Sequence, residues 1–116
     1  MGKKNRDRWQ APPQDIILPQ EGPLNVEEEL RRAMASRFLP EADLHGMTTS
    51  EVAFEVDQLV ADHPGVCVRV VAGQGTGAIA RTVETYLKSL ARRKDKPILG
   101  YRMDLNTHSF VVRTAD

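Results

Sequence analysis

An acidic and an imidazole side chain stand two residues apart in the segment Asp43-Leu44-His45-Gly46. In an extended chain, this spacing places both side chains on one face and directs Leu44 to the other face, into the core. A carboxylate beside an imidazole favours the protonated ring and orients it, and an oriented imidazole can transfer a proton at a phosphate ester. Alternatively, Asp43 caps a turn at a strand end and His45 is a satisfied polar group. Gly46 permits a sharp turn immediately afterwards.

A glycine-rich segment, Gly73-Gln74-Gly75-Thr76-Gly77, follows one predicted helix and one predicted strand later. Its glycines remove side chains where backbone N–H groups must approach an anion, and the next helix directs its positive end to the same place. Thr76 is expected to cap that helix or to contact a phosphate. The alternative is a tight strand-to-helix turn that needs positive φ angles. A P-loop is excluded because no GK[ST] follows, and the spacing also departs from the GxGxxG of dinucleotide sites.

Three further reactive side chains, His108, His63 and Cys67, could have structural rather than catalytic roles. His108 lies in the expected connection between the last two strands, where it is either a second proton carrier on the same rim or a surface histidine. His63 is expected to cap a helix end, and Cys67 to pack in a buried strand rather than act as a nucleophile. No group of His, Cys and carboxylates has metal-site spacing, so no metal ligands are predicted. A divalent cation such as Mg²⁺ stays open as a cofactor.

The elements that must position these residues follow from hydrophobic spacing and capping residues. Asn25 and Glu28 mark the start of a helix that extends to about residue 39, with Leu30, Met34 and Phe38 on its apolar stripe. The other expected elements are a strand at 42–44, a helix at about 48–62, a strand at 66–71, a helix at about 78–92, and strands at 98–103 and 110–112. This βαβαββ order predicts an α/β (α+β two-layer) domain with helices packed on a small mixed sheet.

The strand-helix-strand unit between residues 42 and 71 should be a right-handed crossover with parallel strands. Parallel neighbours end at the same edge of a sheet, and ligands of open α/β sheets bind outside these carboxyl ends. The acid–imidazole segment ends the first strand, and the glycine segment follows the second. We therefore expect the two segments to lie together on one rim.

Charge is distributed unevenly along the chain of 116 residues, although the formal net charge is zero. Residues 21–62 carry ten acids and three arginines, whereas residues 69–113 carry nine bases and three acids. This asymmetry favours a basic face that binds polyanions, or else an uneven solvated surface. The cations expected to contact phosphate are Arg69, Arg81, Lys88, Arg92 and Arg93, together with Lys3, Lys4, Arg6 and Arg8 near the N-terminus.

Composition predicts one domain with an N-terminal tail. Residues 1–24 are expected to form a flexible, basic and proline-rich extension, and residues 25–116 a single domain with its core at 41–114. No stretch approaches the roughly 18 to 20 apolar residues of a membrane span, and no apolar segment follows the basic N-terminus as in a signal peptide. The single cysteine cannot form an internal disulfide. These features predict a cytoplasmic protein without a membrane partner.

Together, the two motifs resemble the Smr (small MutS-related) domain over residues 41–114. Residues 42–48 (ADLHGMT) are similar to the family's LDLHG-hydrophobic-Thr segment, and residues 70–79 (VVAGQGTGAI) to its IIHGKGTGAL segment. The resemblance implies a βαβαββ fold similar to the C-terminal domain of translation initiation factor 3. It also implies nucleic-acid binding and, in many members, endonuclease activity on DNA or RNA. Some members cleave messenger RNA at stalled ribosomes, which makes the ribosome a further partner.

The resemblance also implies roles for individual residues. It ties Asp43 and His45 to cutting, and the glycine loop to backbone binding through Gly73 and Gly75. We expect the nucleic-acid backbone to be bound by Gly46, Gly73, Gln74, Gly75, Thr76 and Gly77. Two departures bear on cleavage: Ala72 stands where the family usually has histidine, and residues 106–109 replace a glycine-rich stretch. We expect a nucleic-acid-binding domain with endonuclease activity, by hydrolysis or transesterification. The alternatives are a non-catalytic nucleic-acid or ribosome-binding module on the same fold, and a protein-interaction domain that uses the proline-rich extension.

Overall fold

The computed structural model describes residues 25–75 and 77–116. In this part of the chain the elements are, in order, α1 (Val26–Met34), β1 (Glu41–Asp43), the 3₁₀ turn η1 (Thr49–Glu51), α2 (Val52–Asp62), β2 (Cys67–Val71), α3 (Ala78–Arg92), β3 (Ile98–Asp104) and β4 (Ser109–Thr114). The order βαβαββ predicted after the first helix is therefore confirmed. The extension predicted for residues 1–24, with its four cations, lies outside the described residues.

The four strands form one mixed sheet in the order β1-β2-β4-β3. β1 and β2 are parallel, with Asp43 opposite Val71, and β4 is antiparallel to both β2 and β3. The predicted parallel pairing of the first two strands is confirmed, so their carboxyl ends lie at the same edge of the sheet. β2 is an inner strand, in agreement with its nearly continuous run of β-branched residues.

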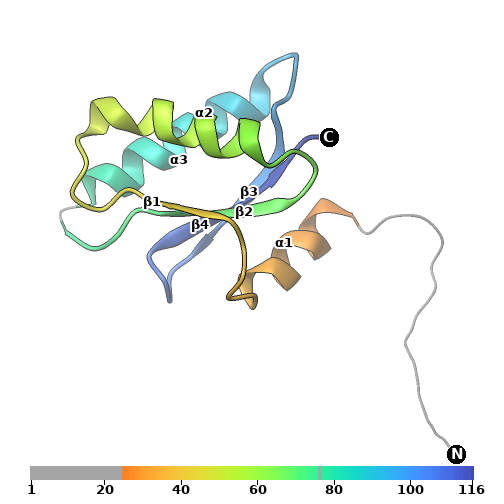
Figure 1. Cartoon of the computed structure of the whole chain (residues 1–116), viewed down its shortest axis with the longest axis horizontal. Coiled ribbons are helices and arrows are strands. Elements are labelled where there is room, and N and C mark those ends of the chain that lie inside the picture. Colours follow the sequence, from red (N-terminus) through yellow and green to blue (C-terminus); the bar gives the residue numbers. More distant parts are fainter. Residues whose placement is uncertain (1–24, 76) are drawn as a thin grey trace, which may run out of the picture.

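Helices α2 and α3 pack together on one face of the sheet, and α1 covers the other face (Figure 1). The main core lies between the sheet and the α2–α3 pair, and its fully buried side chains include Leu44, Val52, Val56, Val68, Val70, Val83 and Leu87. A smaller cluster under α1 contains Leu30, Ala33 and Val111. The predicted α+β fold is confirmed, and α1 adds a helix on the side of the sheet opposite α2 and α3.

Helix α1 begins where the sequence predicts but ends earlier. The side-chain oxygen of Asn25 accepts the backbone N–H of Glu28 at 2.8 Å, as expected of an N-cap residue. The helix ends at Met34 rather than near residue 39, and Phe38, predicted on its apolar stripe, is 93% exposed. The reason is a tertiary contact, because the Arg69 guanidinium donates hydrogen bonds to carbonyl groups where the helix ends. These carbonyls belong to Ala33, Met34 and Ser36.

The other boundaries agree closely with the predictions. α3 has the predicted limits, and Val83, Leu87 and Leu90 form its buried stripe. At the start of η1 the Glu51 carboxylate accepts the backbone N–H of Thr48 at 2.9 Å, as in a capping box. Local capping and periodicity signals thus position the elements that surround the site.

Two reactive side chains have the structural roles predicted for them. His63 is the C-cap of α2, and its Nδ1 lies 3.1 Å from the carbonyl oxygen of Leu59. Cys67 is half-buried at the start of β2, where burial raises the pKa of its thiol. Both residues lie near the end of β2 opposite the glycine loop, which follows Val71.

Candidate functional site

Asp43 and His45 form a hydrogen-bonded pair at the carboxyl end of β1. Oδ1 of Asp43 lies 2.9 Å from Nδ1 of His45 and also accepts the backbone N–H of His45 at 3.1 Å. The second contact closes a local turn, so the carboxylate both caps a turn and orients the ring, the two roles that the sequence left as alternatives. The His45 side chain is 73% exposed, which leaves the ring accessible to a ligand from solvent.

Contact with His45 changes the pKa of the Asp43 carboxyl group. Hydrogen bonds from the ring and from the backbone N–H of His45 lower the pKa of the carboxyl group below its ordinary value of 3.8. The group is therefore a carboxylate at neutral pH, and in a neutral imidazole it selects the tautomer with the proton on Nδ1. Nε2, on the opposite side of the ring, then has a lone pair that can accept a proton.

Leu44 holds this pair on the domain. Its side chain is fully buried, and its backbone N–H donates to the carbonyl of Val71 at 2.7 Å, which extends the β1–β2 pairing by one residue. The backbone N–H of Met47 donates to the carbonyl of Leu44 at 3.0 Å and closes a turn in which Gly46 has φ +81°. The prediction that Leu44 points into the core is confirmed.

The glycine loop lies directly against the acid–imidazole pair. A Cβ atom built on Gly73 would lie 2.7 Å from the Cβ of His45, closer than two carbon atoms can approach without displacement. The expectation that the two segments meet at one edge of the sheet is therefore confirmed. Gly73 is required both by this contact and by its φ of +81°, which residues with a side chain rarely adopt.

The first amides of the loop are bonded within the protein. The backbone N–H groups of Ala72 and Gly73 donate to the carbonyl oxygen of His108 at 3.0 and 3.2 Å. The amide of Gly73, which we expected to approach an anion, is therefore engaged by the β3–β4 connection. In the described part of the chain, the N–H groups of Gln74, Gly75 and Gly77 have no acceptor within hydrogen-bond distance, so these amides are available to an anion.

Gly75 and Gly77 give the rest of the loop a backbone conformation that favours glycine, with φ of +121° and +89°. Nothing lies within 4 Å of a Cβ built on Gly75, so conformation rather than space requires glycine there. Gly77 is the N-cap of α3, and the positive end of this 15-residue helix is therefore at the loop. Thr76, predicted to cap α3 or to contact a phosphate, lies outside the described residues.

A pocket of about 290 Å³ lies between the glycine loop and the turn that precedes η1. Its lining combines the loop, the start of α3 and two threonines, and includes Gly73, Gln74, Gly77, Thr48 and Thr49. Neither threonine was predicted to be a site residue, because both lie where the sequence predicts the start of the helix at about 48–62. Their place in the pocket depends on how η1 packs beside the loop, and no sequence signal reports that packing.

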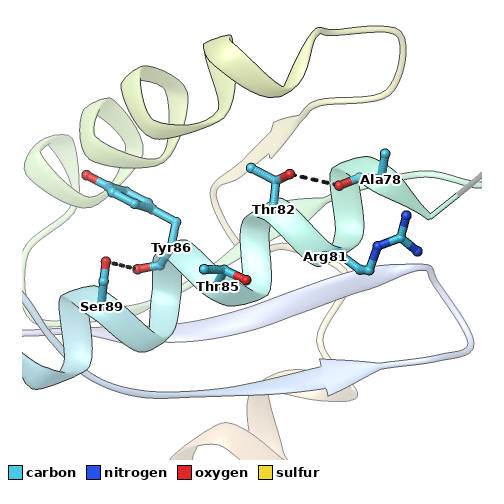
Figure 2. A pocket seen from close by; sticks show the side chains of 6 residues that line it. All are labelled: Ala78, Arg81, Thr82, Thr85, Tyr86 and Ser89. Atoms are coloured by element: carbon cyan, nitrogen blue, oxygen red, sulfur yellow. Dashed lines mark hydrogen bonds between the residues drawn. The ribbon is translucent and has the colours of Figure 1, made fainter.

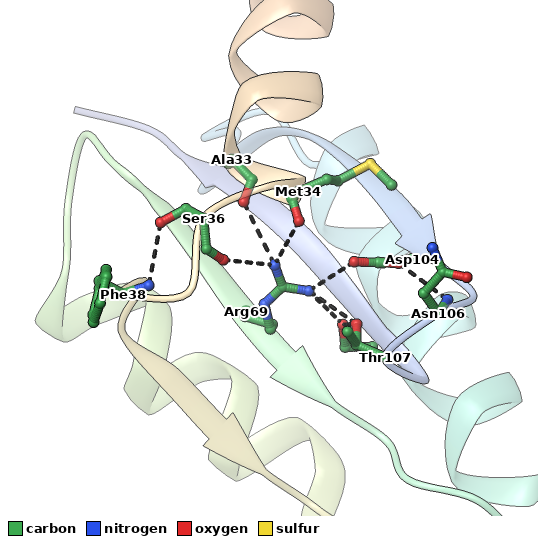
Figure 3. A network of polar contacts seen from close by, with 9 residues as sticks. Ala33, Met34, Ser36, Phe38, Arg69, Asp104, Asn106 and Thr107 are labelled. Carbon is green, nitrogen blue, oxygen red and sulfur yellow. Dashed lines mark hydrogen bonds and ion pairs between the residues drawn. The ribbon is translucent and has the colours of Figure 1, made fainter.

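Arg69 is not on a basic surface, which corrects the prediction that it contacts phosphate. Its side chain is only 9% exposed and forms an ion pair with the buried carboxylate of Asp104 at 3.0 Å. Figure 3 shows the guanidinium group between the end of α1 and the β3–β4 connection, where it also donates to Thr107 and Ser109. A buried cation with these partners is unavailable to a ligand. The charge count failed here because it cannot distinguish an interior cation from a surface cation.

His108 lies in the connection that Arg69 holds. Its φ is +50°, and its carbonyl accepts the two loop amides described above. Its side chain is exposed and lines a small pocket of about 100 Å³ together with Ala72 and Gly73. His108 thus lies beside the glycine loop, on the expected rim. Its role as a second proton carrier stays a prediction.

The remaining predicted cations are distributed along α3. Nη1 of Arg81 lies 3.2 Å from a Cβ built on the N-cap glycine of α3, so this guanidinium is beside the loop. Lys88 and Arg92 are exposed farther along the helix. Arg93 follows the helix end and forms two hydrogen bonds with the carboxylate of Asp95, at 3.0 and 2.7 Å, which offsets its charge.

Two features are absent from the described part of the chain. No three His, Cys, Asp or Glu side chains in residues 25–75 and 77–116 form a group that could hold a metal ion. Over the same residues, no helix combines the length and the apolar character needed to cross a membrane.

The comparison with known families agrees with this geometry. The model of the Smr domain matches residues 42–107, which are more than half of the chain and include both motifs. Smr domains are associated with nucleic-acid binding and nuclease activity. No curated protein matches the chain. With both family motifs at one edge of a mixed four-stranded sheet, this chain belongs to the Smr domain family.

Proposed function

We propose that this domain binds the backbone of RNA or DNA at the carboxyl edge of β1 and β2 and cleaves it as an endonuclease. The observation that supports this proposal is the contact between His45 and Gly73. It brings an exposed, carboxylate-oriented imidazole next to a loop with unpaired amides. A proton-transfer group beside an anion-binding loop suits one phosphodiester group.

The proposed mechanism assigns each group a separate task. The amides of Gln74, Gly75 and Gly77 bind a phosphate at the positive end of α3. Nε2 of His45 removes the proton from the attacking oxygen, which belongs to water or to a ribose 2′-hydroxyl, as its bond to phosphorus forms. The bond from phosphorus to the leaving oxygen breaks, and that oxygen takes a proton from the imidazolium or from solvent. Asp43 keeps the ring in its tautomer and orientation throughout.

The substitution His45→Ala tests the proposal. A general acid or base typically contributes a factor of about 10²–10⁴ in rate, so cleavage of labelled structured RNA and supercoiled plasmid should fall by that factor. Binding of the same substrates should change little, because the loop amides remain. His63→Ala is the matched control, since His63 caps α2 at the other end of the domain. If the wild-type protein binds both substrates but cleaves neither, it is not an endonuclease.

A non-catalytic nucleic-acid-binding module is the second candidate. Ala72 favours it, because this side chain is only 3% exposed and brings no functional group to a position where the related sequences usually have histidine. This candidate predicts that the wild-type protein binds nucleic acid in a salt-dependent way and does not cleave it. His45→Ala should then bind with the same affinity as the wild type.

We also propose that the protein acts in the cytoplasm and associates with ribosomes. This part of the proposal is supported by the family resemblance and by a composition with a single cysteine. Sedimentation of the tagged protein with ribosomes in a cell extract, before and after nuclease treatment, tests it. Recovery of the protein only in fractions free of ribosomes would contradict it.

A further inference from the structure

The exposed side of α3 carries cations that no carboxylate neutralises. Arg81, Lys88 and Arg92 are at positions i, i+7 and i+11, which form a single stripe on a helix with 3.6 residues per turn. In the described part of the chain, none of the three has an Asp or Glu oxygen within 4 Å, whereas most of the arginines are paired. The paired arginines are Arg31, Arg32, Arg69, Arg93, Arg102 and Arg113.

A shallow groove of about 490 Å³ lies beside this stripe. Of the three cations it is Arg81 that lines the groove, together with Ala78, Thr82, Thr85, Tyr86 and Ser89. Figure 2 shows that the hydroxyls of Thr82 and Ser89 bond helix carbonyls. Thr85 is different: it is exposed, it lies between Arg81 and Lys88 on the stripe, and its hydroxyl has no partner in residues 25–75 and 77–116. Hydroxyl groups of this kind bind phosphate oxygens beside arginine and lysine.

Acidic residues border the stripe on both sides. On the α2 side, the hydroxyl of Tyr86 donates to the carboxylate of Asp57 at 2.5 Å. Burial and this hydrogen bond raise the pKa of Tyr86 to about 12, so the hydroxyl stays protonated and donates to the Asp57 carboxylate beside the groove. On the other side lies the half-buried Glu84. These carboxylates repel a polyanion from the borders and favour a path along the cations.

The stripe is continuous with the glycine loop. The Arg81 guanidinium lies beside Gly77, the N-cap of α3, and the helix then leads away from the acid–imidazole pair. From Arg81 to Arg92 the helix rises about 16 Å. This length corresponds to about five phosphates of one strand at the B-form axial spacing of about 3.4 Å.

We infer that α3 is a second binding segment for the polynucleotide, along which the strand continues from the glycine loop in one direction. Arg81, Thr85, Lys88 and Arg92 contact successive phosphates of that continuation. The inference rests on the proposed binding of a phosphate at the loop, and it adds a definition of the substrate. The preferred ligand is a strand that extends several nucleotides beyond the loop phosphate on one side, whereas a very short oligonucleotide occupies the loop alone.

The test measures binding of labelled single-stranded oligonucleotides of about four and about twelve nucleotides to the full chain by fluorescence anisotropy. Each phosphate contact to a single strand contributes about 0.7 to the slope of log K against log salt, or about fivefold in affinity at about 0.1 M salt. Arg92→Ala should therefore weaken binding of the longer oligonucleotide about fivefold and lower its slope by about 0.7. Binding of the shorter one should not change, and Arg92→Lys should retain the wild-type behaviour.

Arg37→Ala is the matched control, because it removes an exposed cation from the connection between α1 and β1. Equal effects of Arg92→Ala and Arg37→Ala on the longer oligonucleotide would overturn the inference. If the wild type cleaves nucleic acid and Arg92→Ala binds both oligonucleotides like the wild type, the inference about α3 is wrong and the proposed endonuclease activity stands. If the wild type binds the longer oligonucleotide more tightly, and Arg92→Ala lowers that affinity, but no cleavage occurs, the proposed endonuclease activity is wrong and the inference about α3 stands. If neither oligonucleotide binds the wild type, both proposals are wrong.

Discussion

Gly73 is the residue at which the two motifs of the site constrain each other. Its missing side chain allows the loop to contact His45, and its φ of +81° places its amide on the carbonyl of His108. From the sequence, Gly73 was expected to present an amide to phosphate. Its contact with His45 joins residues far apart in the chain, so local sequence could not reveal it.

The substitution Gly73→Ala should therefore damage the site as well as the fold. A side chain at a strained φ costs about 1–3 kcal/mol in the free energy of unfolding. The new Cβ also displaces His45, and a displacement of about 1 Å can lower the rate about 10²-fold. Urea denaturation and the cleavage assay measure the two effects. Gly65→Ala is the control, since Gly65 has a similar φ of +76° and its new Cβ would meet the flexible side chain of Asp116. Equal loss of cleavage in both variants would contradict the role given to Gly73.

At the scale of elements, Arg69 joins three parts of the domain that hydrophobic packing alone would not fix. It lies on β2 and binds carbonyls at the end of α1, and it also binds the Asp104 carboxylate and hydroxyls in the β3–β4 connection. The same connection presents the His108 carbonyl to the glycine loop. The geometry of the loop therefore depends on a cation that never reaches the surface.

Removal of this cation should destabilise the whole domain. Arg69→Met leaves the buried Asp104 carboxylate without its partner, which typically costs about 3–5 kcal/mol in the free energy of unfolding. The double substitution Arg69→Met, Asp104→Leu should recover part of that loss, because no buried charge remains. Urea denaturation of the two variants and the wild type tests this expectation. A change below about 0.5 kcal/mol in Arg69→Met would mean that the ion pair does not support the fold.

The end of α1 allows a second prediction at this scale. Leu30 is 2% exposed and Phe38 is 93% exposed, although both fit the same helical stripe in the sequence. Leu30→Ala should therefore lower the free energy of unfolding by about 2–5 kcal/mol. Phe38→Ala should change it by less than about 0.5 kcal/mol. Thermal and urea denaturation of both variants check the pair. A large loss of unfolding free energy in Phe38→Ala would contradict the exposed position of Phe38 and favour the longer helix that periodicity predicts.

At the scale of the whole molecule, ionisation links the site to stability. Burial alone would raise the pKa of Asp104, but hydrogen bonds from Arg69, Thr107 and the backbone of Asn106 outweigh it, and the pKa lies below the ordinary 3.8. The pKa of Asp43 is lowered as well, by its hydrogen bonds with His45. Near these values the unfolded chain binds more protons than the folded chain, so acid favours unfolding.

The domain should therefore lose stability as the pH falls through these lowered pKa values. The contribution is complete above the ordinary value of 3.8 and is lost below the folded values. The urea midpoint of the wild type should fall as the pH is lowered from about 6 to about 3. Asp104→Asn should have a lower urea midpoint at about pH 6 and a smaller decrease over the same range. A wild-type midpoint that stays constant over this range would contradict the assignment.

Four features could be predicted from the sequence: the order of the elements, the limits of α3, the parallel β1–β2 pair and the place where the two motifs meet. These features follow from signals within single segments, namely hydrophobic periodicity, caps and glycines, and from the topology of a strand-helix-strand unit. Tertiary structure decided where α1 ends, which loop amides are available, and which cations reach solvent. Arg69 and Arg81 are equivalent in any count of charge, yet one lies inside the domain and the other beside the glycine loop. Only contacts between distant segments separate them, because burial is a property of the packed chain.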